Sequence, residues 1–224
     1  MKATPAPQTR PAAIRALALS LFFLVPASPA SAQVDTRQAD TRQAEAGLAD
    51  AADMAAIYRS FCLDNFPNDA GLGTLAASRS AVPMIPAQLQ QYLHVDTGHG
   101  WYLSTPFGRY AITIADPPYR GCAVRRMTPS GLLTAAGYIT AVKAYAQQHG
   151  GQLSPAQTIR RKAPDGVADI SVSVNTLLGA DAKAGQETFL LVLTNYHGRP
   201  PDEDRAAAGD GVGVEVRLAH LVTT

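Results

Sequence analysis

The chain has 224 residues, of which 46% are hydrophobic, and its formal net charge at pH 7 is +1. This length fits one domain, or two small ones, with enough apolar residues to bury a core. A near-neutral charge removes the usual electrostatic reason to expect a nucleic acid as partner. No segment after the N-terminal region is apolar for long enough to span a membrane.

Residues 1–32 are typical of a cleaved signal peptide. They carry three basic residues, no acidic one, and a short apolar run from Ala16 to Val25. A run of about ten residues is half of what a membrane-spanning helix needs. Small residues then precede the predicted cleavage between Ala32 and Gln33. We therefore expect a periplasmic or extracellular protein, whose mature chain has a net charge of −2 because three cations are lost.

Residues 33–46 contain a tandem repeat of the pentapeptide Asp-Thr-Arg-Gln-Ala. The repeat has no large apolar side chain, so burial cannot offset the entropy lost on ordering it. We expect a flexible polar leader to a single domain over residues 47–224. The alternative is that the repeat extends the following helix, since its residues other than Asp and Thr form helices well.

The first element of the domain is a predicted helix over residues 47–66. Its apolar residues follow a spacing of three to four, and Pro67 ends it. Cys62 falls on the apolar face near the end of this helix. Two shorter helical segments are expected over residues 69–79 and 87–93.

The pattern then changes to a period of two, which predicts an antiparallel meander of three strands over residues 99–104, 109–115 and 119–126. Cys122 lies on the inward face of the third strand. With only two cysteines in an exported chain, we expect a disulfide between Cys62 and Cys122. Two buried thiols, or a catalytic thiol, are the alternatives.

The rest of the chain predicts one helix and four strands. Thr128 and Pro129 are typical of a helix start, and the glycines at 150 and 151 of its end. The strands are expected over residues 156–162, 169–175, 188–194 and 211–219, the third of them central because it is almost wholly apolar. The fold class is therefore α+β: a mostly antiparallel sheet of six or seven strands, two main helices on one face, and the order α-βββ-α-ββββ.

A group of cations gives the first candidate site. Arg125 and Arg126 precede the predicted helix of residues 128–150, and Arg160 and Lys162 follow it. If their strands are neighbours, Arg125 and one or two of Arg160, Arg161 and Lys162 share the sheet face opposite the core. They would form a basic strip able to hold an anionic ligand or an acidic partner. The alternative is a solvated strand that cations protect against edge-to-edge aggregation.

The second candidate is the aromatic hairpin around residues 100–110, which includes Trp101 and Tyr102. Exposed, it would form a recognition edge for a partner; buried, it would close the first hairpin, and burial is the favoured interpretation.

No catalytic motif, metal-ligand set or cofactor-binding loop is evident in the sequence. His94, Asp96 and His99 lack a third strong ligand at metal-binding spacing. We therefore expect a non-catalytic binding or envelope-associated module, with no cofactor. Its partner would be an anionic ligand or an envelope protein. The alternative is an extracytoplasmic hydrolase with a dispersed acid–base site, for example Asp96 and His99 with Asp116.

Overall fold

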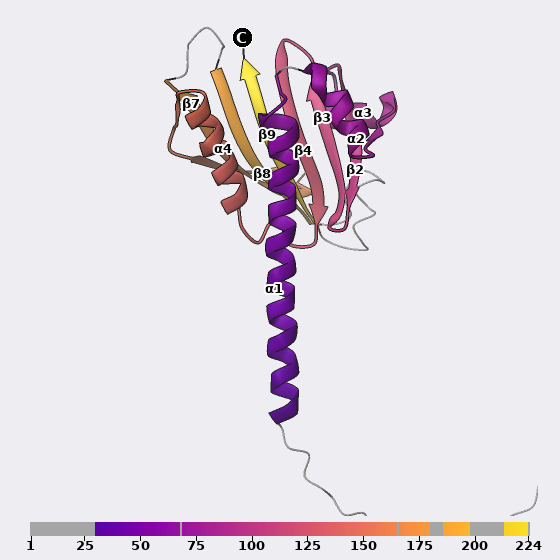
Figure 1. Cartoon of the computed structure of the whole chain (residues 1–224), viewed down its shortest axis with the longest axis vertical. Coiled ribbons are helices and arrows are strands. Elements are labelled where there is room, and N and C mark those ends of the chain that lie inside the picture. The colour runs from indigo at the N-terminus through magenta and orange to yellow at the C-terminus, as the bar shows by residue number, and fades with distance from the viewer. Residues whose placement is uncertain (1–29, 68, 165, 180–185, 198–212, 224) are drawn as a thin grey trace, which may run out of the picture. The chain divides into compact units, whose positions relative to one another are not determined.

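Alternating apolar residues build an antiparallel sheet, which carries helices α1 and α4 on one face (Figure 1). The structure is a computed structural model that describes residues 30–67, 69–164, 166–179, 186–197 and 213–223. The chain divides into two units, residues 1–38 and residues 39–224. Residues 30–38 are the first turns of helix α1, and the second unit holds the sheet and the other helices. The fold class is α+β, as the sequence predicts.

The helical elements in chain order are α1 (Ala30–Tyr58), the π-helical turn η1 (Arg59–Leu63), the 3-10 turn η2 (Asp69–Gly71), α2 (Leu72–Ser78), α3 (Pro86–Leu93) and α4 (Ala136–Gln148). The strands are β1 (Val82–Pro83), β2 (Gly98–Thr105), β3 (Gly108–Ala115), β4 (Tyr119–Thr128), β5 (Gln152–Leu153), β6 (Gln157–Lys162), β7 (Ala168–Leu178), β8 (Gln186–Tyr196) and β9 (Val214–Thr223).

The nine described strands exceed the six or seven expected because β1 and β5 contain only two residues each. A pair of residues carries no readable alternation, so the sequence could not show them. The seven longer strands correspond to the seven predicted ones. The sheet order is β1-β2-β3-β4-β9-β8-β7-β5, with β6 also paired to β7. The C-terminal strand β9 therefore lies between the two meanders, and β8 is an interior strand as expected.

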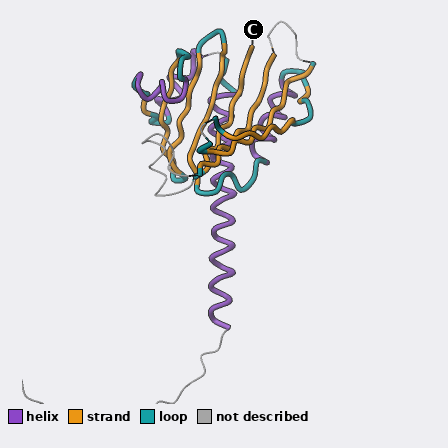
Figure 2. Tube along the Cα trace, turned by 180° about the vertical axis from the view of Figure 1, so that it is seen from behind, coloured by secondary structure: helices purple, strands orange, loops and turns teal. Residues whose placement is uncertain are grey.

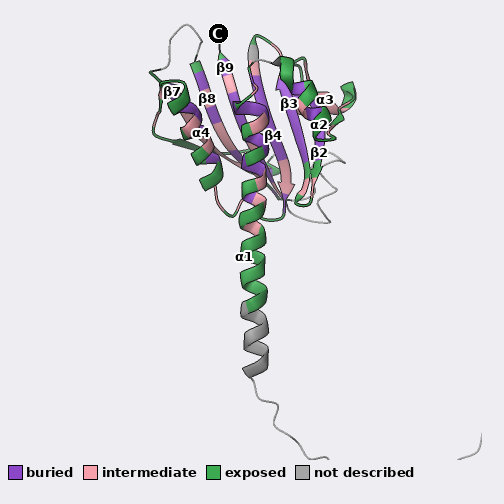
Figure 3. Cartoon of the chain, viewed as in Figure 1, coloured by how far each residue is buried: buried purple, intermediate pink, exposed green. Residues whose placement is uncertain are grey.

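The core lies between the sheet and the helices on one face. Tyr58 and Phe61 from the first helical segment are buried against alternate residues of β2, β3, β4 and β9 (Figure 3). The disulfide links Cys62 in η1 to Cys122 on β4, with 5.3 Å between the Cα atoms. The helix is thus pinned covalently to the third strand of the meander, and the sequence-based pairing is confirmed.

Helix α3 lies on the opposite face of the sheet, which is the face seen in Figure 2. The Cβ of an alanine at position 100 would lie 3.1 Å from the Met84 sulfur and 3.2 Å from Leu89 Cδ1. Glycine at position 100 therefore allows α3 and the turn before it to approach β2. The helical segment expected over residues 87–93 corresponds to α3, but the sequence did not show on which face of the sheet it lies.

The polar leader is helical in the structure, because α1 begins at Ala30. The interpretation that the repeat extends the following helix therefore describes the structure, although residues 38–46 are exposed. The segment 1–29 of the predicted signal peptide lies outside the described residues, and the cleavage between Ala32 and Gln33 stays a prediction. No helix within the described ranges is long and apolar enough to cross a membrane.

The predicted helix start at Thr128 is wrong. Thr128 is the last residue of β4, and its hydroxyl accepts a hydrogen bond from the Gly131 N–H at 2.7 Å. Gly131 has a φ of +88°, which is incompatible with a helix, and α4 begins only at Ala136. The threonine therefore caps a turn instead of a helix. On α4, Tyr138 and Tyr145 are buried, whereas Ile139 is 44% exposed.

Candidate functional site

The four candidate cations do not form one strip, because β9, β8 and β7 separate β4 from β6 in the sheet. Arg126 lies on the face that packs against α1. Its guanidinium donates to both carboxylate oxygens of Asp50, the longer bond being 2.8 Å, and to the Tyr110 hydroxyl at 2.9 Å. Tyr110 in turn donates to Asp53 at 2.9 Å. Arg126 therefore ties α1 to the sheet.

Arg125, one residue earlier, points to the opposite face and is also buried. Its guanidinium donates to the Thr113 hydroxyl at 2.6 Å and lies 5.3 Å from the centre of the Tyr92 ring on α3. The Glu215 carboxylate lies 4.0 Å from its Nε. Arg125 therefore holds α3 against the sheet, and the side chains of both Arg125 and Arg126 are only 8% exposed.

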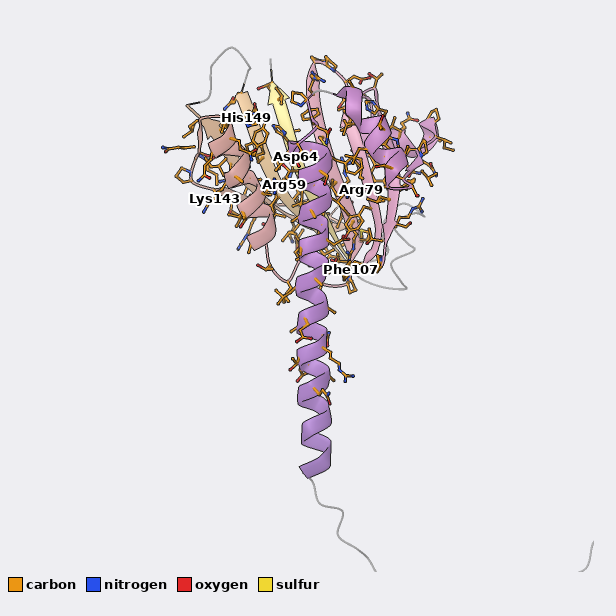
Figure 4. The ribbon with its side chains drawn as sticks, in the orientation of Figure 1. Arg59, Asp64, Arg79, Phe107, Lys143 and His149 are labelled. Atoms are coloured by element: carbon orange, nitrogen blue, oxygen red, sulfur yellow. A yellow bond between two sulfur atoms is a disulfide. The ribbon has the colours of Figure 1, made fainter. Side chains whose placement is uncertain are left out.

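The aromatic hairpin is buried, so it does not form the recognition edge. Trp101 lies on the core face, 6.4 Å from Phe61 between ring centres. Tyr102 lies on the other face, beneath the Arg109 guanidinium at 3.7 Å from its ring centre. At the tip of the hairpin Phe107 remains 37% exposed (Figure 4). The favoured interpretation of this segment, burial, describes both residues, although only Trp101 belongs to the core cluster.

Arg160 and Lys162 line an open cavity of about 710 Å³, which we call the cationic pocket. Strand alternation puts both residues on the face that carries α4, and pairing brings Arg160 beside Ser171 and Lys162 beside Asp169. The same two rows continue into β8, at Leu193 and Asn195. The lining residues are Ser130, Gly131, Leu132, Arg160, Arg161, Lys162, Asp169, Ile170, Ser171, Leu193, Asn195 and Val214.

The charge and polarity of the cationic pocket suit an anion with an apolar part. Within the described part of the chain, its lining includes three cations and one carboxylate, Asp169. Asp169 already has a partner, because one of its oxygens lies 3.1 Å from His197 Nε2. The side chains of Ser130, Ser171 and Asn195 add neutral hydrogen-bonding groups, and leucines and valine supply apolar surface. A guanidinium and an ammonium that flank a cavity can bind a carboxylate, sulfate or phosphate by charge-assisted hydrogen bonds.

The loop before α4 contributes Ser130, Gly131 and Leu132 to the pocket, although it is some 30 residues from β6 in sequence. The local pattern did not predict this contribution, because the segment was expected to be helical. Asp169, Leu193 and Asn195 were likewise missed. Their signal was present in the strand alternation, but only the register between β6, β7 and β8 brings them beside Arg160 and Lys162.

A second cavity of about 400 Å³, which we call the apolar cavity, lies beneath α4. Its lining comes from α4, from residues 153–156, which lead from β5 to β6, and from β7 and β8: Tyr138, Ile139, Val142, Lys143, Leu153, Ser154, Pro155, Ala156, Ser173, Asn175 and Leu191. Lys143 is exposed on α4 (Figure 4). Both cavities fall within the range of volumes typical of small-molecule sites.

A buried polar cluster that the sequence did not predict joins β8, β9, η1 and α4. His220 is fully buried; its Nδ1 lies 2.8 Å from the Cys62 carbonyl oxygen and its Nε2 lies 2.8 Å from Glu187 Oε2. Tyr145 donates to the same carboxylate oxygen at 2.8 Å. A carbonyl oxygen only accepts, so Nδ1 carries the hydrogen of that bond.

Burial raises the pKa of the Glu187 carboxyl, but hydrogen bonds from His220 and Tyr145 and the nearby imidazole charge outweigh burial. The pKa of Glu187 therefore lies below its ordinary value, and the carboxylate is ionised beside His220. His220 is enclosed by the rings of Phe66, Tyr145 and Phe189. A fully enclosed imidazole cannot reach a substrate, so we interpret the cluster as a structural joint. The signal that could have found it is the alternation of β9, which continues inward from Leu218 to His220.

The residues named for the dispersed acid–base site lie at one end of the β2–β3 hairpin. The Asp116 N–H donates to the Thr97 carbonyl at 2.9 Å, and the His99 ring is edge-on to Trp101 at 5.1 Å. Nothing in these contacts tests catalysis, and the hydrolase hypothesis stays a prediction. Within the part of the chain that the structure describes, no three side chains of His, Cys, Asp or Glu gather into a metal-binding group.

Comparisons with known proteins identify no relative: the chain matches no protein-family model, no curated protein and no solved structure.

Proposed function

We propose that this chain is an exported, non-catalytic binding module that holds an anionic ligand in the cationic pocket. The observation that carries the proposal is that Arg160 and Lys162, from the same face of β6, line one cavity of about 710 Å³, whose lining also includes Arg161. Among the residues that the structure describes, Asp169 is the one carboxylate in the lining, and it lies 3.1 Å from His197 Nε2.

The competing explanation of these cations is protection of the exposed strand β6 against aggregation. Edge protection needs only charged side chains on the strand; it does not need a cavity beside them. The pocket, however, also draws Ser130 and Leu132 from the loop before α4, and Leu193 from β8. Convergence of separate segments on one hollow is typical of a binding site, and it supports ligand binding over edge protection.

Export is supported by the disulfide between Cys62 and Cys122, because such bonds persist in oxidising compartments. The predicted signal peptide supplies the means of export. Intact mass spectrometry of the protein recovered from the periplasm or the medium tests both together. We expect a chain that starts at Gln33 and lacks two hydrogens. A chain that retains residues 1–32, or one found only in the cytoplasm, would contradict export.

Binding is tested with 8-anilinonaphthalene-1-sulfonate, an anionic aromatic probe whose fluorescence rises in apolar surroundings. We expect saturable binding to the wild type, and a Kd at least about tenfold higher for Arg160→Gln/Lys162→Gln, because each lost charge-assisted bond is worth roughly 1.5–3 kcal/mol when buried and less at an open pocket.

The matched control is Arg42→Gln/Arg59→Gln, which changes the net charge equally. Arg42 is exposed on α1, and Arg59 forms an exposed ion pair with Asp64 at 3.5 Å (Figure 4). We expect this control to bind the probe like the wild type. Equal weakening in both double variants would show a general charge effect and refute the site.

A further inference from the structure

The cationic pocket and the apolar cavity lie side by side along β7 and β8. Ser171 lines the first and Ser173 the second, and likewise Leu193 lines the first and Leu191 the second. Residues two apart on a strand point to the same face and are about 7 Å apart. One step along each strand therefore leads from one cavity to the other, on the same face of the sheet.

The two cavities differ in chemistry. The first carries the cations of β6, whereas Ile139, Val142, Leu153 and Leu191 give the second a mostly apolar wall. Two polar groups of the second cavity are already engaged, whereas the buried Tyr138 hydroxyl has no hydrogen-bond partner among the described residues, and Lys143 adds an exposed cation. The Ser154 hydroxyl accepts from the Thr176 N–H at 2.9 Å, and the Asn175 amide donates to the Ser154 carbonyl at 3.0 Å. What this cavity offers a ligand is therefore chiefly apolar surface.

Ile139 on α4 supports this division. It is 44% exposed, although it belongs to a helix whose neighbouring Tyr138 and Val142 are buried, and it lines the apolar cavity. A large exposed aliphatic side chain at the wall of a cavity gains hydrophobic free energy when a ligand covers it.

We infer that the ligand is a single-chain anionic amphiphile, such as a long-chain carboxylate. Its acidic head lies against Arg160 and Lys162, and its alkyl chain passes beneath α4 into the apolar cavity. This inference rests on the proposed function and adds the ligand class: an anion alone would fill only the cationic pocket, and an uncharged hydrocarbon would leave the cations of β6 unpaired.

The test is the affinity of the full chain for saturated carboxylates of 8, 10, 12 and 14 carbons, measured by calorimetry below their micelle-forming concentrations. Burial of the alkyl chain predicts that each added pair of methylene groups tightens binding several-fold, up to about fifteenfold. Ser173→Phe places a ring in the apolar cavity and should remove this dependence on chain length. Ala156→Trp blocks the same cavity from its other wall if the first variant fails to fold.

The outcomes separate the two proposals. A chain-length dependence that Ser173→Phe abolishes, with Arg160→Gln/Lys162→Gln weakening all lengths by the same factor, supports the inference. If the charge variant weakens binding but chain length has no effect, the anion site stands and the amphiphile is overturned. If affinity depends on chain length but the charge variant binds as tightly as the wild type, both the anion site and the amphiphile are overturned. Binding to vesicles of an anionic phospholipid, with none to the free carboxylates, would also overturn the inference, because the site would then recognise a membrane surface.

Discussion

The two ends of the helix-bearing face of the sheet use similar residues for different purposes. At the end formed by β2, β3 and β4, α1 and η1 cover the strands, and Arg126 is bonded to Asp50 and Tyr110. At the end formed by β6, β7 and β8, Arg160 and Lys162 are exposed beside a cavity, and α4 leaves a second cavity beneath it. The comparison shows that burial, more than residue type, separates a structural cation from one available to a ligand.

The largest expected effect comes from removing the disulfide at the covered end. The chain-entropy model for a loop that spans 60 residues gives a loss of about 4 kcal/mol in the free energy of unfolding of Cys62→Ala/Cys122→Ala. Urea titration followed by circular dichroism measures it. Reduction of the wild type with a thiol reagent is the control, because it breaks the covalent link and keeps both sulfur atoms. A loss below about 1 kcal/mol would show that α1 is held by packing alone.

The next effect comes from Arg126→Met, which leaves the half-buried carboxylate of Asp50 without its partner. We expect a loss of about 2–3 kcal/mol in the free energy of unfolding, since breaking a largely buried pair strands a charge. The double variant Asp50→Asn/Arg126→Met should lose less than the single one, because the stranded charge is gone. Equal losses in both would mean that packing, and not the charge pair, carries the contribution of Arg126.

The Glu187 cluster predicts a pH dependence of stability. Because the pKa of Glu187 is lowered in the folded protein, the carboxylate contributes stability above its ordinary pKa, and this contribution is lost as pH falls through the folded value. Between pH 6 and pH 3 the urea midpoint of the wild type should therefore fall more steeply than that of Glu187→Gln. Parallel curves would remove the carboxylate as the cause. Tyr145→Phe, which deletes one donor, should cost only about 1 kcal/mol at neutral pH.

The smallest effect on stability is expected at the open end. Arg160→Gln/Lys162→Gln should change the free energy of unfolding by no more than about 0.5 kcal/mol, because both side chains are exposed. The same variant should lose anion binding. A large loss of stability there would place Arg160 or Lys162 in the structural class with Arg126, and the contrast between the two ends of the sheet would disappear.

Local pattern was sufficient for most of the fold. The period of two predicted every strand longer than two residues, and the inward positions of Cys62 and Cys122 predicted their pairing. The helix start at Thr128 failed because a threonine followed by proline caps a turn as well as a helix, and Gly131 then selected the turn. The burial of Trp101 was favoured from its size, since large aromatic residues dominate small cores.

Only part of the candidate site could be predicted from local sequence pattern. The cations of β6 were evident in the sequence, but they were grouped with Arg125 and Arg126, which the structure buries on either side of β4. Alternation fixes which residues of one strand share a face, because the side chains follow the geometry of the backbone. It says nothing of which strand lies next to which.

The sequence by itself therefore determined the α+β class, the strands and the covalent pin, all of which depend on local periodicity or on a simple count of cysteines. Tertiary structure alone decided that β9 separates the two meanders, that the loop before α4 meets β6, and that His220 meets Glu187 and Tyr145. The physical reason is that long-range pairing minimises the free energy of the whole sheet, with its register and helix packing together. No segment of the chain carries that information alone.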